Sequence, residues 1–79
     1  MHIITEESGS AAEMTPAEKE RTLLHHMIHH NEQHQEEFVS LRDSLSSEGK
    51  DEAAKELTEA IKSAEELLSH LRSAYEALG

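Results

Sequence analysis

The sequence predicts an all-α protein, an antiparallel two-helix hairpin that dimerises into a four-helix bundle. Three observations support this prediction. Residues 16–47 and 51–78 are long segments without glycine or proline, apart from a proline at position 16. Both segments repeat apolar residues at the spacing of helices that pack in pairs. Only residues 48–50 separate them, which suits a tight reversal of direction.

Residues 1–14 precede the helices and mix small, polar and acidic residues without a helical or strand period. Such a segment cannot bury enough apolar surface to order itself. We therefore expect a flexible N-terminal arm over residues 1–14, followed by one helical domain over residues 15–79.

The ends of both helices carry recognisable signals. Thr15 is a good N-cap, Pro16 suits the first helical position, and Glu18 completes a capping box. Gly49 offers the left-handed conformation that ends many helices. These signals predict a first helix over 16–47, a turn over 48–50, and a second helix over 51–78 capped by Asp51.

Each helix has a line of residues at alternating a and d positions of a heptad, which is the seam expected to face the other helix. Folding the chain at the turn would set Phe38 near Ile61 and Met27 near Leu71. The seam of the first helix is Leu24, Met27, Asn31, His34, Phe38, Leu41 and Leu45, and that of the second is Ala54, Leu57, Ile61, Ala64, Leu68, Leu71, Tyr75 and Leu78.

The apolar stripe of the second helix is wider than one partner helix can cover, because its g positions are also apolar. A hairpin of this size also buries little surface on its own. We therefore expect a homodimer or a higher homo-oligomer. The apolar g positions are Ala53, Ala60, Leu67 and Ala74.

Composition excludes several classes of partner. The 79 residues include 17 Asp+Glu against 7 Lys+Arg, for a net charge of -10, so nucleic acid and anionic membranes are unfavourable partners. No apolar run is long enough to cross a membrane or serve as a signal peptide. The expected location is the cytoplasm. Because there is no cysteine, disulfides and thiolate metal sites are excluded.

Seven residues are histidine, and five of them lie between positions 25 and 34. Polar residues interrupt the apolar face of the first helix at His30, Asn31, His34 and Glu37, which we call the polar patch. Burying such groups without partners costs about 1–3 kcal/mol each. A divalent metal would satisfy them, since imidazole and carboxylate are its ligands and i, i+4 and i+7 share a helix face. With His26 one turn earlier, the predicted metal ligands are His26, His30, His34 and Glu37.

Simpler explanations stay open for individual residues. The whole cluster can be a solvated helix face. His25 and His29 occupy outward positions and are better explained as exposed, although they would also form a surface i, i+4 pair for a metal. His70 on the second helix is either exposed or a lid over the site, and exposure is the preferred interpretation. Asn31 is alternatively a buried amide that sets helix register.

An enzymatic role is the less favoured interpretation, and we assign no catalytic residue and no organic cofactor. A ferritin-like di-iron site needs Glu-x-x-His, which is absent. A zinc protease needs His-Glu-x-x-His, whereas residues 30–34 read His-Asn-Glu-Gln-His and direct Glu32 to the outer face. A minimal metalloenzyme with an open coordination position remains a third possibility.

Residues 26–38, HMIHHNEQHQEEF, resemble a segment of small uncharacterised bacterial and archaeal helical hairpin domains. Those domains carry His-x-x-x-His-Asn-x-x-His followed by acidic residues and Phe, a glycine-containing turn, and a helix rich in Ala, Glu and Leu. The resemblance covers residues 18–78 and implies a metal-associated role without naming a reaction. The matching positions are His26, His30, Asn31, His34, Glu37 and Phe38.

The first two residues, Met1 and His2, are similar to the start of nickel-hydrogenase maturation chaperones. Those proteins bind nickel through the terminal amine and the imidazole. This resemblance makes nickel a metal to test.

Together these observations predict a small His-rich protein that binds a divalent transition metal for storage, sensing or delivery to a receiving protein. Without thiolates, Zn(II), Ni(II), Co(II) and Cu(II) are favoured. The alternative is a metal-free oligomerisation or protein-interaction module in which the histidines act as a pH switch. Their protonation below about pH 6.5 would place like charges within the interface.

Overall fold

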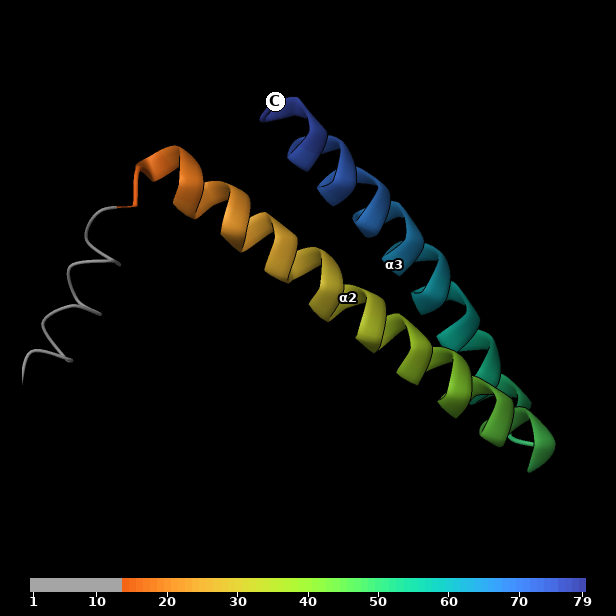
Figure 1. Cartoon of the computed structure of the whole chain (residues 1–79). Coiled ribbons are helices and arrows are strands. Elements are labelled where there is room, and N and C mark those ends of the chain that lie inside the picture. The colour runs from red at the N-terminus through yellow and green to blue at the C-terminus, as the bar shows by residue number, and fades with distance from the viewer. Residues whose placement is uncertain (1–13) are drawn as a thin grey trace, which may run out of the picture.

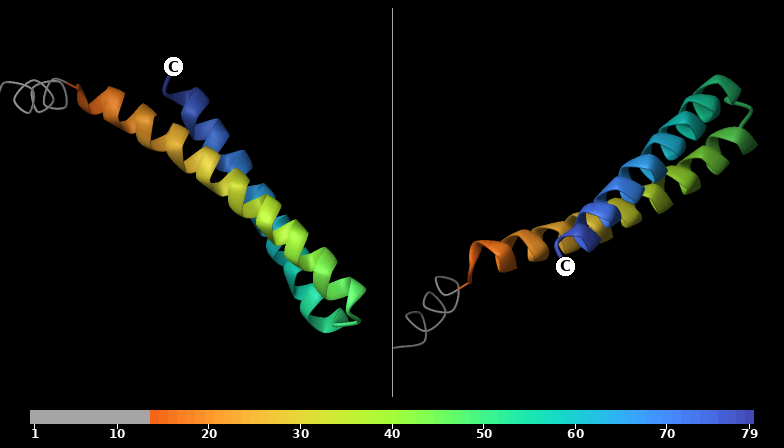
Figure 2. Two further views of the ribbon diagram at one scale, coloured as in Figure 1. Left: turned by 60° about the horizontal axis from the view of Figure 1, so that its bottom comes forward. Right: turned by 90° about the horizontal axis from the view of Figure 1, so that it is seen from above.

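The computed structural model describes residues 14–79 as two helices, α2 (Pro16–Ser47) and α3 (Asp51–Ala77), joined by a short loop. The helices run antiparallel and side by side, and α2 extends past the C-terminal end of α3 (Figures 1 and 2). The helical hairpin predicted from the sequence is therefore confirmed. The expectation of a flexible arm falls on residues 1–14, nearly all of which lie outside the described residues.

The start of α2 shows the capping box that the sequence predicts. The Thr15 hydroxyl accepts a hydrogen bond from the backbone N–H of Glu18 at 3.1 Å. The Glu18 carboxylate in turn accepts from the backbone N–H of Thr15 at 2.9 Å. Two of the backbone donors left free at a helix start are thus satisfied, and this fixes where α2 begins.

Gly49 closes the loop with a φ of 79°, the left-handed conformation that glycine adopts without strain. The Lys50 N–H reaches back to the Leu45 carbonyl at 2.9 Å and satisfies one of the last acceptors of α2. The predicted cap of the second helix is wrong, because Lys50 occupies the N-cap position without a side-chain bond. Asp51 instead lies in the first turn of α3, where its charge suits the helix dipole.

Among residues 14–79, the core is a single line of three buried side chains, Ala54, Ile61 and Leu68, spaced seven residues apart on α3. This spacing agrees with the seam predicted for the second helix, except at its last position, where Leu78 is 40% exposed. No residue of α2 is fully buried. Leu68, only 2% exposed, is the most deeply buried side chain of residues 14–79.

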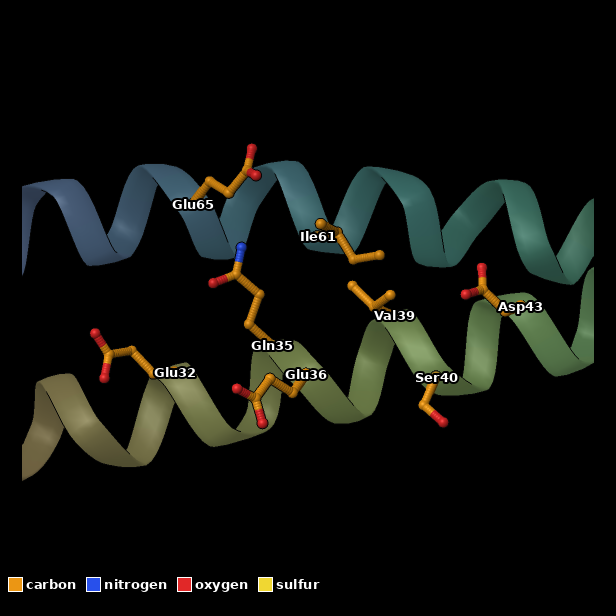
Figure 3. Close-up of a pocket in the computed structure, with 8 residues that line it drawn as sticks. All are labelled: Glu32, Gln35, Glu36, Val39, Ser40, Asp43, Ile61 and Glu65. Carbon is orange, nitrogen blue, oxygen red and sulfur yellow. The ribbon is translucent and has the colours of Figure 1, made fainter.

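The seam predicted for the first helix is wrong at two positions, because Met27 is 44% exposed and Leu41 is 53% exposed. The helix is rotated so that Ile28, Gln35 and Val39 are half-buried at the interface instead. Figure 3 shows Val39 facing Ile61 and Gln35 extending towards α3. The rotation is possible because the predicted seam of α2 contains two residues of the polar patch, Asn31 and His34, so apolar burial alone favours no single face.

A shallow groove runs along one side of the hairpin (Figure 3). Its charged lining is entirely acidic, and Val39 and Ile61 are its apolar residues. Neither helix of the described residues has a stretch long and apolar enough to cross a membrane. The groove residues are Glu32, Gln35, Glu36, Val39, Ser40, Asp43, Ile61 and Glu65.

Candidate metal centre

Two histidines of the polar patch, His30 and His34, lie one helical turn apart on α2 with their rings directed at each other. Their Nε2 atoms are 2.8 Å apart, and the rings meet edge to face with centroids separated by 4.4 Å. The i, i+4 spacing brings the two side chains onto one face of the helix. The sequence therefore predicted this pair, and the structure places its two ring nitrogens together.

The separation of these nitrogens suits two ligands of one metal ion. With metal–nitrogen bonds of about 2.0–2.1 Å, two ligands are about 2.9 Å apart at a right angle and about 3.3 Å apart at the tetrahedral angle. The 2.8 Å between the Nε2 atoms of His30 and His34 lies close to the lower value. Without an ion, this contact is a hydrogen bond in which one of the two Nε2 atoms carries the proton. Chelating an ion would therefore require that nitrogen to lose its proton and both rings to turn slightly.

Glu37 contacts the far side of the His34 ring, where its Oε1 lies 3.1 Å from Nδ1. A neutral imidazole that donates Nδ1–H to a carboxylate keeps the lone pair on Nε2. Metal-binding histidines are commonly held in this way by a carboxylate on their second nitrogen. In this structure Glu37 is placed to orient His34 rather than to meet a metal beside the Nε2 atoms.

His26 contacts the pair only through its ring. It stacks on His30 with centroids 5.9 Å apart and an interplanar angle of 28°. Within residues 14–79, no three His, Asp or Glu side chains are grouped so that they could hold one ion together. The four predicted ligands therefore form a chain of contacts along α2, in which the close nitrogen pair is that of His30 and His34.

Apolar side chains surround this pair on the same face of α2. Leu23, Met27 and Leu41 are exposed there, and the Phe38 ring stacks on His34 with centroids 6.2 Å apart. We call this surface the histidine face, defined by Leu23, Met27, His30, His34 and Leu41.

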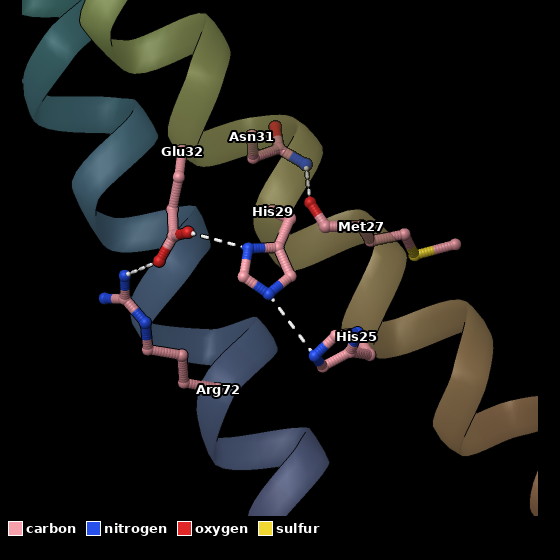
Figure 4. A network of polar contacts seen from close by, with 6 residues as sticks. All are labelled: His25, Met27, His29, Asn31, Glu32 and Arg72. Carbon is pink, nitrogen blue, oxygen red and sulfur yellow. Dashed lines mark hydrogen bonds and ion pairs between the residues drawn. The ribbon is translucent and has the colours of Figure 1, made fainter.

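A second pair of histidines, His25 and His29, was interpreted from the sequence as exposed. Both are exposed, but their Nε2 atoms are also directed at each other, 3.3 Å apart (Figure 4). On its other side, His29 has Nδ1 3.4 Å from Oε1 of Glu32. The arrangement repeats that of His30, His34 and Glu37 on another side of α2.

Glu32 is the site residue that sequence reasoning placed wrongly. It is half-buried, and its Oε2 accepts a hydrogen bond from Arg72 of α3 at 2.6 Å (Figure 4). This hydrogen bond is the main reason that the pKa of Glu32 is lowered. Partial desolvation acts to raise the pKa, and the nearby charges of Arg72 and His29 act to lower it further. The spacing between His29 and Glu32 was visible in the sequence, but the pairing with Arg72 depends on the register of the hairpin.

Two further residues have clear positions. Asn31 is half-buried, and its side-chain amide donates to the backbone carbonyl of Met27 at 2.8 Å, within its own helix (Figure 4). Its amide N–H therefore has a partner within α2. His70 is exposed on α3, as the preferred interpretation of the sequence expected.

These features define a helical hairpin with paired histidines along one helix. Residues 20–78 match a family model described as a domain of unknown function (DUF8180). The match covers most of the chain, so the protein belongs to this family. It also agrees with the resemblance to an uncharacterised small domain that the sequence suggested. No curated protein and no solved structure matched the chain.

Proposed function

We propose that this protein binds a divalent transition metal through His30 and His34, with Glu37 holding His34 in the metal-binding tautomer. The observation that carries the proposal is the 2.8 Å distance between the two Nε2 atoms, together with the carboxylate 3.1 Å from Nδ1 of His34. His26, stacked on His30, is the candidate for a further ligand after a change of rotamer.

A second copy of the chain completes the site in this proposal. Two imidazoles leave coordination positions open, and a metal such as zinc prefers four ligands. In a symmetric dimer the same surface of each protomer meets its copy. If two histidine faces meet, His30 and His34 of both protomers surround one ion between two hairpins, and the result is a four-helix bundle.

The exposed apolar residues support this choice of partner. The hairpin buries only three side chains among residues 14–79, while the large side chains of Leu23, Met27 and Leu41 remain exposed on the histidine face. A domain with so small a core gains stability by covering such a surface. Each chain has a net charge of -10, so the bound cation also reduces repulsion between the protomers.

The ligand set indicates which metals to expect. Imidazole ligands suit Zn(II), Ni(II), Co(II) and Cu(II), and the chain has no thiolates to favour softer ions. We propose a role in storage, sensing or delivery of such an ion in the cytoplasm, with delivery to a metal-receiving protein. The Met1–His2 start is a separate candidate for nickel and lies outside the described residues.

Zinc titration of chelator-treated protein tests this proposal. A ligand at a hundred times its Kd stabilises a protein by about 2.7 kcal/mol, which corresponds to roughly 10–20 °C in Tm for a domain of this size. Zinc is also expected to shift the protein from monomer to dimer in sedimentation. The variant His30→Ala, His34→Ala is expected to lose zinc-linked dimerisation, whereas His70→Ala keeps it. Equal zinc-linked dimerisation in all three proteins would reject the site.

A metal-free interaction module is the second candidate, and the exposed apolar residues of the histidine face favour it as well. In that case the hairpin dimerises through the same surface without an ion. Protonating both His30 and His34, whose Nε2 atoms are 2.8 Å apart, would then set two N–H groups against each other and loosen the dimer. Sedimentation distinguishes the candidates: this one predicts a dimer that is indifferent to chelator and dissociates in mild acid.

A further inference from the structure

We propose that His25 and His29 form a second metal site, separate from the histidine face, which links α2 to the C-terminal half of α3. The site takes a divalent ion such as zinc on the two Nε2 atoms. Each of its histidines also contacts an α3 residue or a side chain held by one, so metal binding stabilises the docking of the two helices. Among residues 14–79, the ring contacts and hydrogen bonds of His30 and His34 all lie within α2.

The nitrogen pair has the separation that two ligands of one ion require. The Nε2 atoms of His25 and His29 are 3.3 Å apart, and two nitrogens on a tetrahedral zinc are separated by about 3.3 Å. The rings meet edge to face with centroids 4.5 Å apart. Both side chains are exposed, so an ion reaches them from solvent and water completes its coordination.

Glu32, which Arg72 holds in place, lies beside Nδ1 of His29 and favours the tautomer that a metal on Nε2 needs. Oε1 of Glu32 lies 3.4 Å from Nδ1 of His29, while Oε2 of the same carboxylate accepts from Arg72 at 2.6 Å (Figure 4). With its proton on Nδ1, His29 has the Nε2 lone pair free for an ion. Because Arg72 belongs to α3, the orientation of His29 depends on contact between the helices.

His25 is connected to α3 through an aromatic contact. Its ring lies 6.2 Å, centroid to centroid, from the ring of Tyr75. The Arg21 guanidinium lies 5.4 Å from the same Tyr75 ring centroid and restrains it from the side of α2. An ion that fixes His25 and His29 therefore strengthens two contacts with the last two turns of α3. His25 contacts Tyr75 directly, and His29 is connected to Arg72 through Glu32.

The two proposed sites are independent in position. His25 and His30 are five residues apart, which corresponds to a rotation of about 140° around the helix. His29 and His34 are related in the same way. The second site therefore faces the side of the hairpin that carries Glu32 and Arg72, away from the histidine face, and a dimer formed through that face leaves it open.

Zinc binding by calorimetry tests the second site directly, with each site removed in turn. All proteins carry His2→Gln, which removes the N-terminal imidazole as a ligand. The variant His30→Ala, His34→Ala is expected to bind one zinc per chain, and adding His25→Ala and His29→Ala is expected to abolish that binding. Adding His70→Ala instead is the matched control and is expected to keep one zinc. Unchanged zinc binding without His25 and His29 would overturn the proposal.

Hydrogen exchange tests the link to α3. In the His30→Ala, His34→Ala protein, zinc is expected to slow amide exchange over residues 70–77 of α3. The further change Arg72→Met is expected to weaken zinc binding by about 10–100-fold, the usual effect of losing a group that orients a ligand. Glu32→Gln is expected to do the same, and Lys62→Met is the control. Zinc binding without protection of α3, or unaffected by Arg72→Met, would show that the pair is an isolated helical chelate and reject the link.

These results also separate the two proposals. Zinc-linked dimerisation depends on His30 and His34, whereas the slowing of amide exchange in α3 by zinc depends on His25 and His29. Failure of the histidine face therefore leaves the second site intact, and failure of the second site leaves the histidine face intact.

Discussion

Arg72 of α3 donates a hydrogen bond of 2.6 Å to Glu32 of α2, and within residues 14–79 this is the one ion pair that joins the two helices. The other ion pairs of the described residues lie within one helix or within the loop region. Glu32 also faces His29, so a single carboxylate connects a histidine pair to the opposite helix.

This ion pair predicts how stability depends on pH in chelator-treated protein. The pKa of Glu32 is lowered in the folded chain by the hydrogen bond from Arg72. A lowered pKa stabilises the fold above the ordinary glutamate pKa, and this contribution is lost as the pH falls through the lowered value. Urea unfolding of Arg72→Met is therefore expected to show lower stability than the parent at neutral pH, and the difference should disappear in acid.

The matched control for that experiment is Lys62→Met, which removes the cation of a pair within α3, where Lys62 lies 3.2 Å from Glu59. Exposed pairs of this kind contribute little to stability. If Glu32 is responsible, the difference in unfolding free energy between Arg72→Met and the parent changes with pH. A difference that stays constant down to strongly acidic pH would show that Arg72 acts through packing rather than through Glu32.

Glu37→Gln is expected to weaken zinc binding at His30 and His34 by about 10–100-fold. The amide keeps the size of the side chain but is a weaker acceptor for the Nδ1–H of His34. Calorimetry in a protein that also carries His2→Gln, His25→Ala and His29→Ala isolates this site. The control is Glu36→Gln, because Glu36 lies on the groove side of α2. Equal affinities for the two variants would mean that Glu37 does not orient His34.

Leu67 and Leu68 offer a matched pair of neighbouring leucines, 46% and 2% exposed respectively. Leu68→Ala is expected to destabilise the hairpin by about 2–3 kcal/mol, the lower part of the usual range, because the core is a single line of side chains. Leu67→Ala should leave the unfolding of the monomer almost unchanged. Urea unfolding at low protein concentration measures both.

Leu67→Ala is expected instead to weaken the dimer. Leu67 is about 140° around α3 from Arg72, and His34 is about 160° around α2 from Glu32. Because Arg72 and Glu32 contact each other on one side of the hairpin, Leu67 and His34 both lie on the other. Sedimentation with zinc measures the dissociation constant, and an unchanged value would exclude Leu67 from the interface.

Thr15→Ala is expected to cost about 1 kcal/mol, because it removes the hydroxyl that accepts from the Glu18 N–H. The control is Thr22→Ala, an exposed position inside α2 where alanine is the better helix former. Circular dichroism during urea unfolding compares the two variants. A cost for Thr22→Ala as large as that for Thr15→Ala would argue against a specific role of the cap.

Much of the fold could be predicted because its signals are local. Thr15, Glu18 and Gly49 act through backbone groups a few residues away, so their roles are visible in sequence. The seam of α3 was predicted because a clean heptad leaves one apolar face. The seam of α2 was predicted wrongly at Met27 and Leu41 because polar residues interrupt its apolar pattern, and packing against α3 then decides the rotation.

The candidate site, too, could be predicted from the sequence only in part. The pairing of His30 with His34 follows from i, i+4 spacing, so the sequence located it. The orientation of Glu37 towards Nδ1 of His34 depends on rotamers, which spacing does not specify. The link from Glu32 to Arg72 joins residues 40 positions apart, so only the register of the folded hairpin reveals it.

The single line of buried residues on α3 also has a kinetic consequence. Ala54 packs close to the loop, where contacts join residues near each other in sequence, whereas Leu68 packs much farther along the chain. Contacts that close small loops form first and at the lowest entropic cost. Assembly is therefore expected to start at Gly49 and to finish near Arg72, and thermal opening should follow the reverse order. An ion held by His25 and His29 would bind where folding is completed, and so would act mainly by slowing the first step of opening.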